Sequence, residues 1–335
     1  MACISANQAI ASCIGLLNSG AADICIAGGA ETMSDVPIRF SPGLRKAMLA
    51  SRKVKSPAGY LQLLSKLKAK DLAPEAPAIA EFSSGETMGQ SADRLAARFG
   101  VTREEQDDFA LRSHTQARDA FEAGLLKDIE PIFSPKAKGF VSKDNGVRVG
   151  TKEKLAGLKP AFVKPHGTIT AANASYLTDG ASACLLMTES KAKELGYKPL
   201  AYLNAFTFDP KEQLLLGPAY ATKKVLERAG LQLSDIDVIE FHEAFAGQVL
   251  ANINAIESDK FCQEYMGLKG KLGSVDMNKF NNWGGSLSIG HPFGATGVRL
   301  VTTAAHRLHH EDGKYGLVAA CAAGGLGHAM IVERA

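Results

Sequence analysis

The stretch GLVAACAAGG, residues 316–325, is typical of a buried strand that runs into a glycine turn. An earlier stretch, ADICIAGG at residues 22–29, has the same character. The two strand ends match, because Cys25-Ile-Ala-Gly-Gly corresponds to Cys321-Ala-Ala-Gly-Gly. Two matched strands so far apart in one chain indicate an internal duplication.

Each of these strands follows a stretch with helical character. Residues 4–18 carry a mostly apolar helical pattern, and residues 294–308 carry another. Cys3 therefore stands in one copy where His291 stands in the other.

Helices and strands alternate between the two copies. Thr102-Arg-Glu-Glu105 is a capping box for a helix through Glu122, and Gly230 ends a helix over residues 220–229. Further strands are expected at residues 180–188, 200–208 and 237–241, and a further helix at residues 244–256. This alternation predicts an α/β fold with largely parallel sheets.

The segment 35–165 has a different composition. It is rich in proline and lysine, with helical patterns and weak strand signals. We expect it to form an inserted, mostly helical loop domain. Residues 1–34 and 166–190 then belong to the N-terminal half of the duplication, and residues 191–335 form its C-terminal half.

Composition excludes several classes of protein. Hydrophobic residues make up 46% of the 335 residues and charged residues 22%, as in an ordinary globular protein. The net charge of +3 is too small to indicate nucleic-acid binding. The most apolar run, residues 315–332, contains glycines and His328 and indicates buried strands rather than a membrane span. The cysteines are scattered without a Cys-x-x-Cys pair, which argues against a disulfide framework and against a zinc site.

A basic segment lies between Arg45 and Lys70. It contains eight lysines or arginines and no acidic residue, and Leu61, Leu64 and Leu67 lie near helical spacing. One interpretation is a helix whose basic face is solvated and whose leucine stripe packs against the core. The other is a basic amphipathic helix on an anionic membrane surface or a partner. The spacing alone leaves both open.

Four residues with reactive side chains fall at strand ends or helix starts, where α/β folds gather their sites. Cys3 lies at the start of a helix, where the backbone N–H groups and the macrodipole favour a thiolate nucleophile. His242 follows the predicted strand 237–241, His291 lies in a glycine-rich stretch, and Cys321 ends its strand. Together they suggest a nucleophile, a histidine base and a second thiol beside glycine turns.

Five motifs, taken in chain order, resemble the signatures of the thiolase family. They are CISANQA (3–9), GGAETMS (28–34), HEAFAGQ (242–248), GGSLSIGHPFGATG (284–297) and CAAGGLG (321–327). The likeness is closest to the 3-ketoacyl-CoA thiolases that form the β subunit of the mitochondrial trifunctional fatty-acid oxidation complex, and to their bacterial counterparts. His242 stands where most thiolases have asparagine, and the basic insertion at residues 59–70 resembles a membrane-associated segment of that subfamily.

The resemblance implies thiolytic cleavage of a 3-ketoacyl-CoA through an acyl-Cys3 intermediate. His291 would take the proton from Cys3, and Cys321 would protonate the departing acetyl-CoA enolate. His291 and a water held by His242 would stabilise one oxyanion, and the backbone N–H groups of Cys3 and Ala323 the other. Ala323 replaces a common glycine, but alanine also supplies the N–H group.

The resemblance also implies the binding partners. Ser175 would touch the pantetheine arm of coenzyme A, and Met88 would line the acyl pocket. No metal or cofactor is needed, because coenzyme A is a substrate. The expected assembly is a homodimer core joined to a hydratase/dehydrogenase α subunit. The expected location is the mitochondrial inner membrane, with the bacterial cytoplasm as the alternative.

One departure from the family pattern is large. Thiolases have several strands and helices before the nucleophile, whereas here the nucleophile is the third residue. We therefore expect a truncated N-terminal half, from an internal start, a shortened isoform or an incomplete chain. Two other functions stay open: a ketoacyl synthase-like condensing enzyme, against which Cys321 weighs, and a catalytically silent scaffold subunit.

Overall fold

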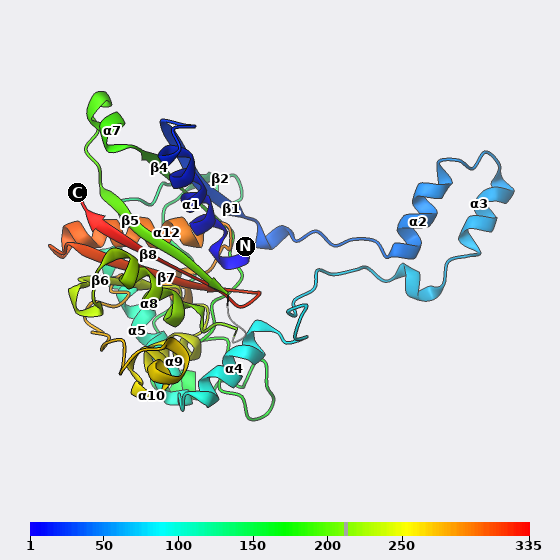
Figure 1. Ribbon diagram of the computed structural model, residues 1–335. Helices are drawn as coiled ribbons and strands as arrows, with labels where there is room; N and C mark the ends of the chain where they lie inside the picture. The colour runs from blue at the N-terminus through cyan, green and yellow to red at the C-terminus, as the bar shows by residue number, and fades with distance from the viewer. Residues whose placement is uncertain (211–213) are drawn as a thin grey trace.

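A computed structural model describes residues 1–210 and 214–335 and centres on a four-stranded sheet with the order β5-β8-β7-β6 (Figure 1). Its strands are β5 (Ala201–Pro210), β6 (Val238–Phe241), β7 (Tyr315–Ala322) and β8 (Leu326–Arg334). Successive β7 side chains alternate between two apolar clusters on opposite faces of the sheet. Leu317 and Ala319 belong to one cluster, and Val318 and Ala320 belong to the other. The sheet is therefore covered on both sides.

Helices α8 (Gly217–Ala229) and α9 (Ala246–Glu257) supply the cover on one face. Val225 of α8 and Val249 of α9 are fully buried in the same cluster as Leu317. Gly230 caps α8 in the left-handed conformation, as the sequence predicts. The short helix α10 (Asp259–Met266) follows α9 and adds Phe261 to this cluster.

Two helices from the matched segments cover the other face. They are α1 (Ser5–Asn18), preceded by a short 3₁₀ turn at Ala2–Ile4, and α12 (Thr296–His310). They pack side by side and bury Ile4, Ile10 and Leu300 against the sheet. On their far side lies a two-stranded sheet of β1 (Ile24–Glu31) and β4 (Gly180–Met187). Helix α7 (Glu189–Leu195) leads from β4 to β5.

The strand directions correct one expectation from the sequence. Among the described strands only the β6–β7 pair is parallel, whereas β5–β8, β7–β8 and β1–β4 are antiparallel. The expectation of largely parallel sheets is therefore wrong. Gly324 and Gly325 both have positive φ and turn β7 directly back into the antiparallel strand β8.

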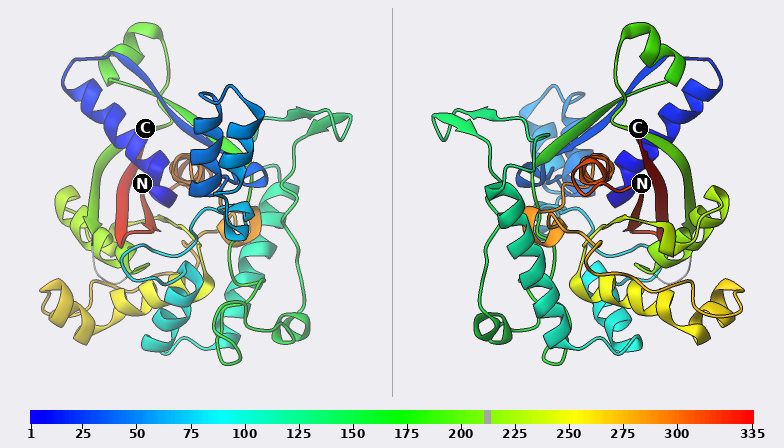
Figure 2. Two further views of the ribbon diagram at one scale, coloured as in Figure 1. Left: turned by 90° about the vertical axis from the view of Figure 1, so that its right-hand side faces the viewer. Right: turned by 90° about the vertical axis from the view of Figure 1, so that its left-hand side faces the viewer.

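The segment after β1 contributes helices that pack on the body and a strand hairpin that extends from it. Helices α4 (Met88–Arg98), α5 (Arg103–Glu122) and α6 (Lys152–Ala156) lie near the body, with a hairpin of β2 (Ile132–Ser134) and β3 (Gly139–Val141) that extends outward (Figure 2). The capping box at Thr102 is present, as predicted. Short 3₁₀ turns lie at Met33–Asp35, Ala69–Leu72 and Leu233–Asp235, and α11 spans Ser286–Ile289.

Helices α2 (Pro42–Ser51) and α3 (Pro57–Leu64) form a helical hairpin that stands far from the sheets (Figure 1). The predicted amphipathic helix ends at Leu64 rather than continuing to Lys70. Leu61 and Leu64 are 69% and 60% exposed, so the interpretation of a stripe turned toward the core is wrong. The described helices include none that is long and apolar enough to cross a membrane.

The outer face of the β1–β4 sheet is open in this chain. Ile26 and Leu185 are paired across the two strands and point to the same side of the sheet. Their side chains are 73% and 49% exposed, so this side is uncovered. In the corresponding β7–β8 hairpin of the other half, the equivalent face is covered by α8 and α9. The two halves of the duplication thus share a strand pair and a central helix and differ in their outer layer.

Candidate active site

Cys3 lies in the 3₁₀ turn that leads into α1, in the central layer of the fold. Burial raises the pKa of its thiol to about 11, and the backbone N–H groups of Ala323 and Cys3 offset this only in part. Burial therefore opposes the thiolate form that the helix start favours. Desolvation outweighs the helix dipole, so the thiol needs a base that removes its proton.

His291 enters the same space from the loop before α12. Its side chain is 3% exposed, and its Nδ1 lies 2.7 Å from Thr296 Oγ1. The Thr296 hydroxyl also lies 3.1 Å from the Pro292 carbonyl oxygen, which can only accept. Thr296 therefore donates to Pro292 and accepts from His291 Nδ1–H. This leaves a free lone pair on His291 Nε2, as a general base requires.

His242 follows β6 and is fully buried beside His291. The two ring centres lie 4.0 Å apart, and His242 Nδ1 lies 3.0 Å from Ser286 Oγ. Arg299 Nη2 donates to the same oxygen at 2.9 Å, and a guanidinium cannot accept. Among the described residues, His242 Nδ1 is the one acceptor in contact with the Ser286 hydroxyl, so this hydroxyl donates its hydrogen to Nδ1. The hydrogen of His242 then lies on Nε2, the opposite tautomer from His291.

Burial also lowers the pKa of both histidines. The pKa of His242 falls to about 3 because of desolvation, with a smaller contribution from the Arg299 charge. The pKa of His291 falls well below its usual value because of burial and because of the neighbouring His242 and Arg299. Both rings are therefore neutral near pH 7, so each has one nitrogen that donates and one that accepts.

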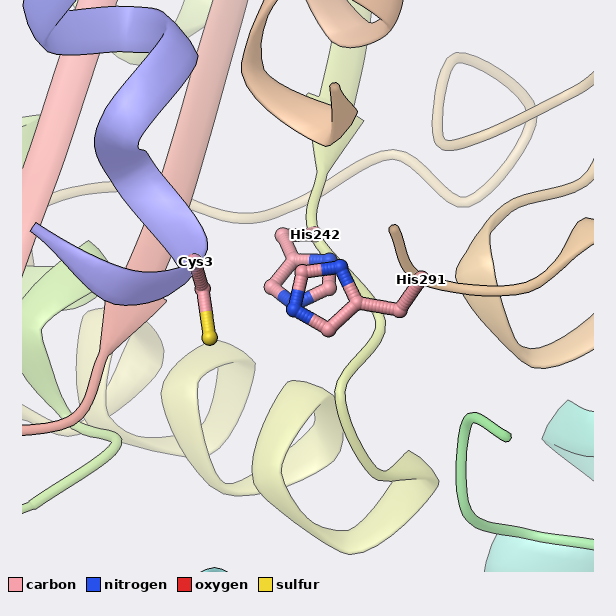
Figure 3. A group of neighbouring side chains, drawn as sticks. All are labelled: Cys3, His242 and His291. Carbon is pink, nitrogen blue, oxygen red and sulfur yellow. The ribbon is translucent and has the colours of Figure 1, made fainter. Parts of the chain in front are cut away.

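The sulfur and the two rings converge on one point. Cys3 Sγ and one ring nitrogen from each of His242 and His291 all lie within 4.8 Å of one another. Figure 3 shows the sulfur turned toward the two rings, with a nitrogen of His291 on the side that faces it. Three segments that are distant in the sequence thus place a thiol and two imidazole rings together.

Cys321 lies at the end of β7 and is fully buried. Burial and the nearby Cys3 thiol raise its pKa far above the usual value. Because the Cys3 thiol affects this pKa, Cys321 lies close to Cys3 in the same site. The turn after β7 brings the Ala323 N–H group to the Cys3 sulfur.

Glu243 supports the loop that carries these groups, and it was not singled out by the sequence. It is fully buried and accepts hydrogen bonds from Ser113 and Asn281, both at 2.7 Å, and from the Leu287 N–H group at 3.2 Å. Burial raises its pKa, and these donors oppose that effect. Ser286, Thr296 and Arg299 were not predicted as site residues either, although all of them lie within or beside the thiolase-like motifs.

The two residues predicted to bind substrate come from two further segments of the chain. The Ser175 N–H group donates to the Ala244 carbonyl oxygen at 2.9 Å, so Ser175 lies beside the loop that carries His242. Met88 is the first residue of α4 and packs, half-buried, against the α8–α9 cluster. A cavity of about 980 Å³ lies nearby and is lined by Tyr176 and Thr178. None of the four reacting side chains lines this cavity in the part of the chain that is described.

Two family models match almost the whole chain. The thiolase N-terminal domain matches residues 1–190, and the thiolase C-terminal domain matches residues 197–334. Both halves of the fold described above are therefore thiolase domains.

Curated relatives agree with the family models. The chain is 62% identical over 336 residues to human trifunctional enzyme subunit beta, mitochondrial, with 99% of this chain and 71% of the relative covered. It is 58% identical to a probable 3-ketoacyl-CoA thiolase of Caenorhabditis elegans, with 99% and 75% covered. A 3-ketoacyl-CoA thiolase of Yersinia enterocolitica is 46% identical, with 99% and 77% covered.

Solved structures show the same architecture. The crystal structure of human mitochondrial 3-ketoacyl-CoA thiolase superposes with a TM-score of 0.82 at 29% identity, covering 99% of this chain and 77% of that one. The acetyl-CoA acetyltransferase of Bacillus anthracis gives a TM-score of 0.81 at 33% identity, covering 100% and 77%. With this fold, the two domain matches and the sequence identities, the chain belongs to the thiolase family.

Proposed function

We propose that this chain, an acyltransferase of the thiolase family, cleaves 3-ketoacyl-CoA with free coenzyme A in two half-reactions through an acyl-Cys3 intermediate. The observation that carries the proposal is the convergence of Cys3 Sγ with ring nitrogens of His242 and His291 within 4.8 Å. The products are acetyl-CoA and an acyl-CoA shortened by one acetyl unit. The relatives named 3-ketoacyl-CoA thiolase support this choice of substrate.

The first half-reaction begins with a proton transfer. His291 Nε2 takes the proton from Cys3, whose pKa of about 11 would otherwise keep it protonated at neutral pH. The thiolate attacks the keto carbon, and the bond between that carbon and the acetyl unit breaks. The acyl chain stays on Cys3, and acetyl-CoA leaves as an enolate. Cys321 gives that enolate its proton.

Two oxyanions form along this path and need donors. The first forms at the keto oxygen during attack, where the N–H groups of Cys3 and Ala323 are available. The second forms at the thioester oxygen of the enolate, where the protonated His291 and a water held by His242 Nε2–H can donate. Removing one donor of this kind typically costs about 3–4 kcal/mol of transition-state stabilisation.

The second half-reaction regenerates the enzyme. Cys321, now deprotonated, takes the proton from the thiol of an incoming coenzyme A. That thiol attacks the acyl-Cys3 thioester, and the Cys3 sulfur leaves and regains its proton from His291. Ser175 contacts the pantetheine arm, and Met88 lines the acyl pocket. This chemistry consumes coenzyme A as a substrate and requires no further cofactor.

The setting of the enzyme follows from its named relatives. Trifunctional enzyme subunit beta is named as a mitochondrial protein and as one subunit of a larger enzyme. We therefore place this chain in mitochondria, as a homodimer core that assembles with a hydratase/dehydrogenase α subunit. Residues 35–165 form the loop domain between the two thiolase halves, and residues 45–70 contact an anionic membrane surface.

Mass spectrometry of the intact chain tests the proposed function. The chain is mixed with a 3-ketoacyl-CoA in the absence of free coenzyme A, and an acyl adduct is expected on Cys3. Peptide mapping locates the adduct, which should be absent in Cys3→Ala and present in Cys13→Ala. A catalytically silent scaffold would form no adduct. A condensing enzyme would consume a malonyl donor, which a thiolase should leave untouched.

A further inference from the structure

Two buried nitrogen atoms of the active site lack a hydrogen-bond partner within the chain. Among the described residues, His242 Nε2 and His291 Nε2 are both buried and unpaired, while both Nδ1 atoms contact hydroxyl groups. A buried polar atom without a partner costs free energy, so such atoms indicate a ligand. Cys3 Sγ completes the group, because all three residues offer donor atoms within 4.8 Å of one another.

The geometry points to a zinc site at Cys3, His242 and His291, where one Zn²⁺ per chain binds in competition with the acyl substrate. Thiolate sulfur and imidazole nitrogen are the donors that Zn²⁺ prefers, whereas Mg²⁺ and Ca²⁺ prefer oxygen. Three protein ligands leave a fourth position for water, as in open zinc sites. Zinc here would be a reversible inhibitor, because it occupies the nucleophile and its base together.

The donor atoms lie close to the separations that zinc needs. Zinc holds sulfur at about 2.3 Å and imidazole nitrogen at about 2.0 Å, so tetrahedral donors lie about 3.3–3.6 Å apart. The three atoms here lie within 4.8 Å of one another. Side-chain rotations that bring these atoms closer together would close the site. Figure 3 shows the sulfur beside the two rings.

The surrounding hydroxyl groups fit the role of a supporting shell. Metal-binding histidines use the other ring nitrogen in a hydrogen bond that fixes the ring, as Thr296 does for His291 and Ser286 for His242. His242 must give up its Nε2 hydrogen and carry it on Nδ1. The Ser286 oxygen can then accept from both His242 and Arg299, since a hydroxyl has two lone pairs.

Two nearby charges affect the expected affinity of the site for zinc. The nearby Arg299 opposes a cation, and the Cys3 thiolate supplies one negative charge. Binding exchanges the thiol proton for the metal, so that Zn²⁺ and Cys3–SH give Zn–S–Cys3 and one proton that is released to the buffer. No oxidant or reductant takes part. The affinity should therefore rise with pH until the thiol proton no longer competes.

Two measurements without substrate test the site on the full chain. Isothermal titration with ZnCl₂ should give one ion per chain, and Co²⁺ should give the thiolate-to-cobalt charge-transfer absorption. Zinc should also protect Cys3 from iodoacetamide, as mapped by mass spectrometry. Cys3→Ser should abolish the cobalt band, and His242→Asn should weaken zinc binding by more than about 100-fold, beyond the 10–100-fold cost of losing an outer-shell contact.

Matched controls make the result specific. The control Cys13→Ser changes a cysteine of α1, the helix that follows the turn with Cys3, and the control His309→Gln changes an exposed histidine of α12. Both should bind zinc like the unaltered chain, and circular dichroism checks that every variant is folded. Equal binding of Mg²⁺, zinc binding that survives in Cys3→Ser, or no zinc binding by folded chain that still forms the acyl adduct would each overturn the proposal. The last outcome leaves the proposed function standing.

Discussion

The two adjacent histidines carry their ring hydrogens on different nitrogen atoms, and neighbouring hydroxyl groups determine which nitrogen that is. Thr296 accepts from His291 and so exposes a lone pair, whereas Ser286, held by Arg299, gives its hydrogen to His242. Identical side chains thus present an accepting nitrogen and a donating nitrogen to the same space. The residue type alone could not have made this distinction, because both rings are buried and neutral.

Removing the Thr296 hydroxyl should impair the base. Thr296→Val keeps the shape of this buried side chain but removes the acceptor for His291 Nδ1–H, so the lone pair is no longer held on Nε2. We expect kcat for thiolysis to fall by about 100-fold with KM little changed, since a general base typically contributes about 10²–10⁴-fold. Steady-state thiolysis measures both constants.

Two further variants separate this effect from general damage to α12. Thr302→Val removes a hydroxyl of the same helix that bonds to the Arg299 carbonyl oxygen, and it should keep normal kcat. Thr296→Ser restores the acceptor and should recover most of the activity. Equal activity of Thr296→Val and Thr302→Val would show that this hydroxyl does not set the tautomer.

His328 should make the stability of the fold depend on pH. It is buried in β8 and packs on Phe208 with ring centres 4.7 Å apart, and burial lowers its pKa to about 3. The unfolded chain binds the proton below about pH 6.5, so stability is lost as pH falls through that value toward pH 3. At pH 5 the loss from this one group is about 2 kcal/mol.

Urea unfolding at pH 7 and pH 5 measures the effect. His328→Leu should have a smaller difference in unfolding free energy between the two pH values than the unaltered chain. His309→Gln, which changes an exposed histidine, should keep the full difference. The same pH dependence in all three proteins would exclude His328 as its source.

At the scale of elements, a close approach of α8 to β8 fixes the outer helix layer. A Cβ atom on Gly327 would overlap the backbone of Gly217, at the first residue of α8. Neither glycine has positive φ, so the constraint is space and not backbone conformation. These two glycines let the helix lie directly on the hairpin that carries Cys321.

Gly327→Ala should therefore destabilise the fold. Overpacking of this kind typically costs about 1–3 kcal/mol, because the helix must move away from the strand. Gly316→Ala is the matched control, since a Cβ atom there would lie 3.4 Å from the nearest atom, the Leu308 Cδ1, and can be accommodated. Thermal unfolding followed by circular dichroism compares the two. Equal melting temperatures would contradict the packing argument.

At the scale of the whole molecule, the α2–α3 hairpin is set apart from the catalytic body. It buries no residue in either helix, and Leu49, Leu61 and Leu64 are all at least 60% exposed. Basic side chains surround these leucines in the sequence. An isolated basic, apolar hairpin is suited to an anionic lipid surface, which would cover the leucines and neutralise the charges.

Vesicle sedimentation tests this role of the hairpin. The chain should pellet with cardiolipin-containing vesicles and much less with neutral ones, and added salt should weaken the binding. Leu61→Ser with Leu64→Ser should abolish pelleting while thiolysis continues. Lys191→Gln with Lys193→Gln, which removes the same kind of charge from α7, serves as a control and should bind normally. Equal pelleting with both vesicle types would contradict the prediction.

Much of this protein was determined by local sequence pattern. The duplicated strands, the capped helix at residues 103–122 and the helix ended by Gly230 follow from periodicity and end signals, which act within a few residues. Cys3, His242, His291 and Cys321 stood out because reactive side chains at strand ends and helix starts are typical of α/β sites.

Only the tertiary structure decided the rest, because those properties depend on groups that are distant in the chain. Burial in the central layer overcame the helix dipole and raised the pKa of Cys3. A hairpin at Gly324 and Gly325 made the sheet mostly antiparallel. The tautomer of His242 depends on Ser286, which is 44 residues away and meets this ring only after folding. Desolvation, strand direction and hydrogen-bond partners are properties of the packed molecule, and no local pattern encodes them.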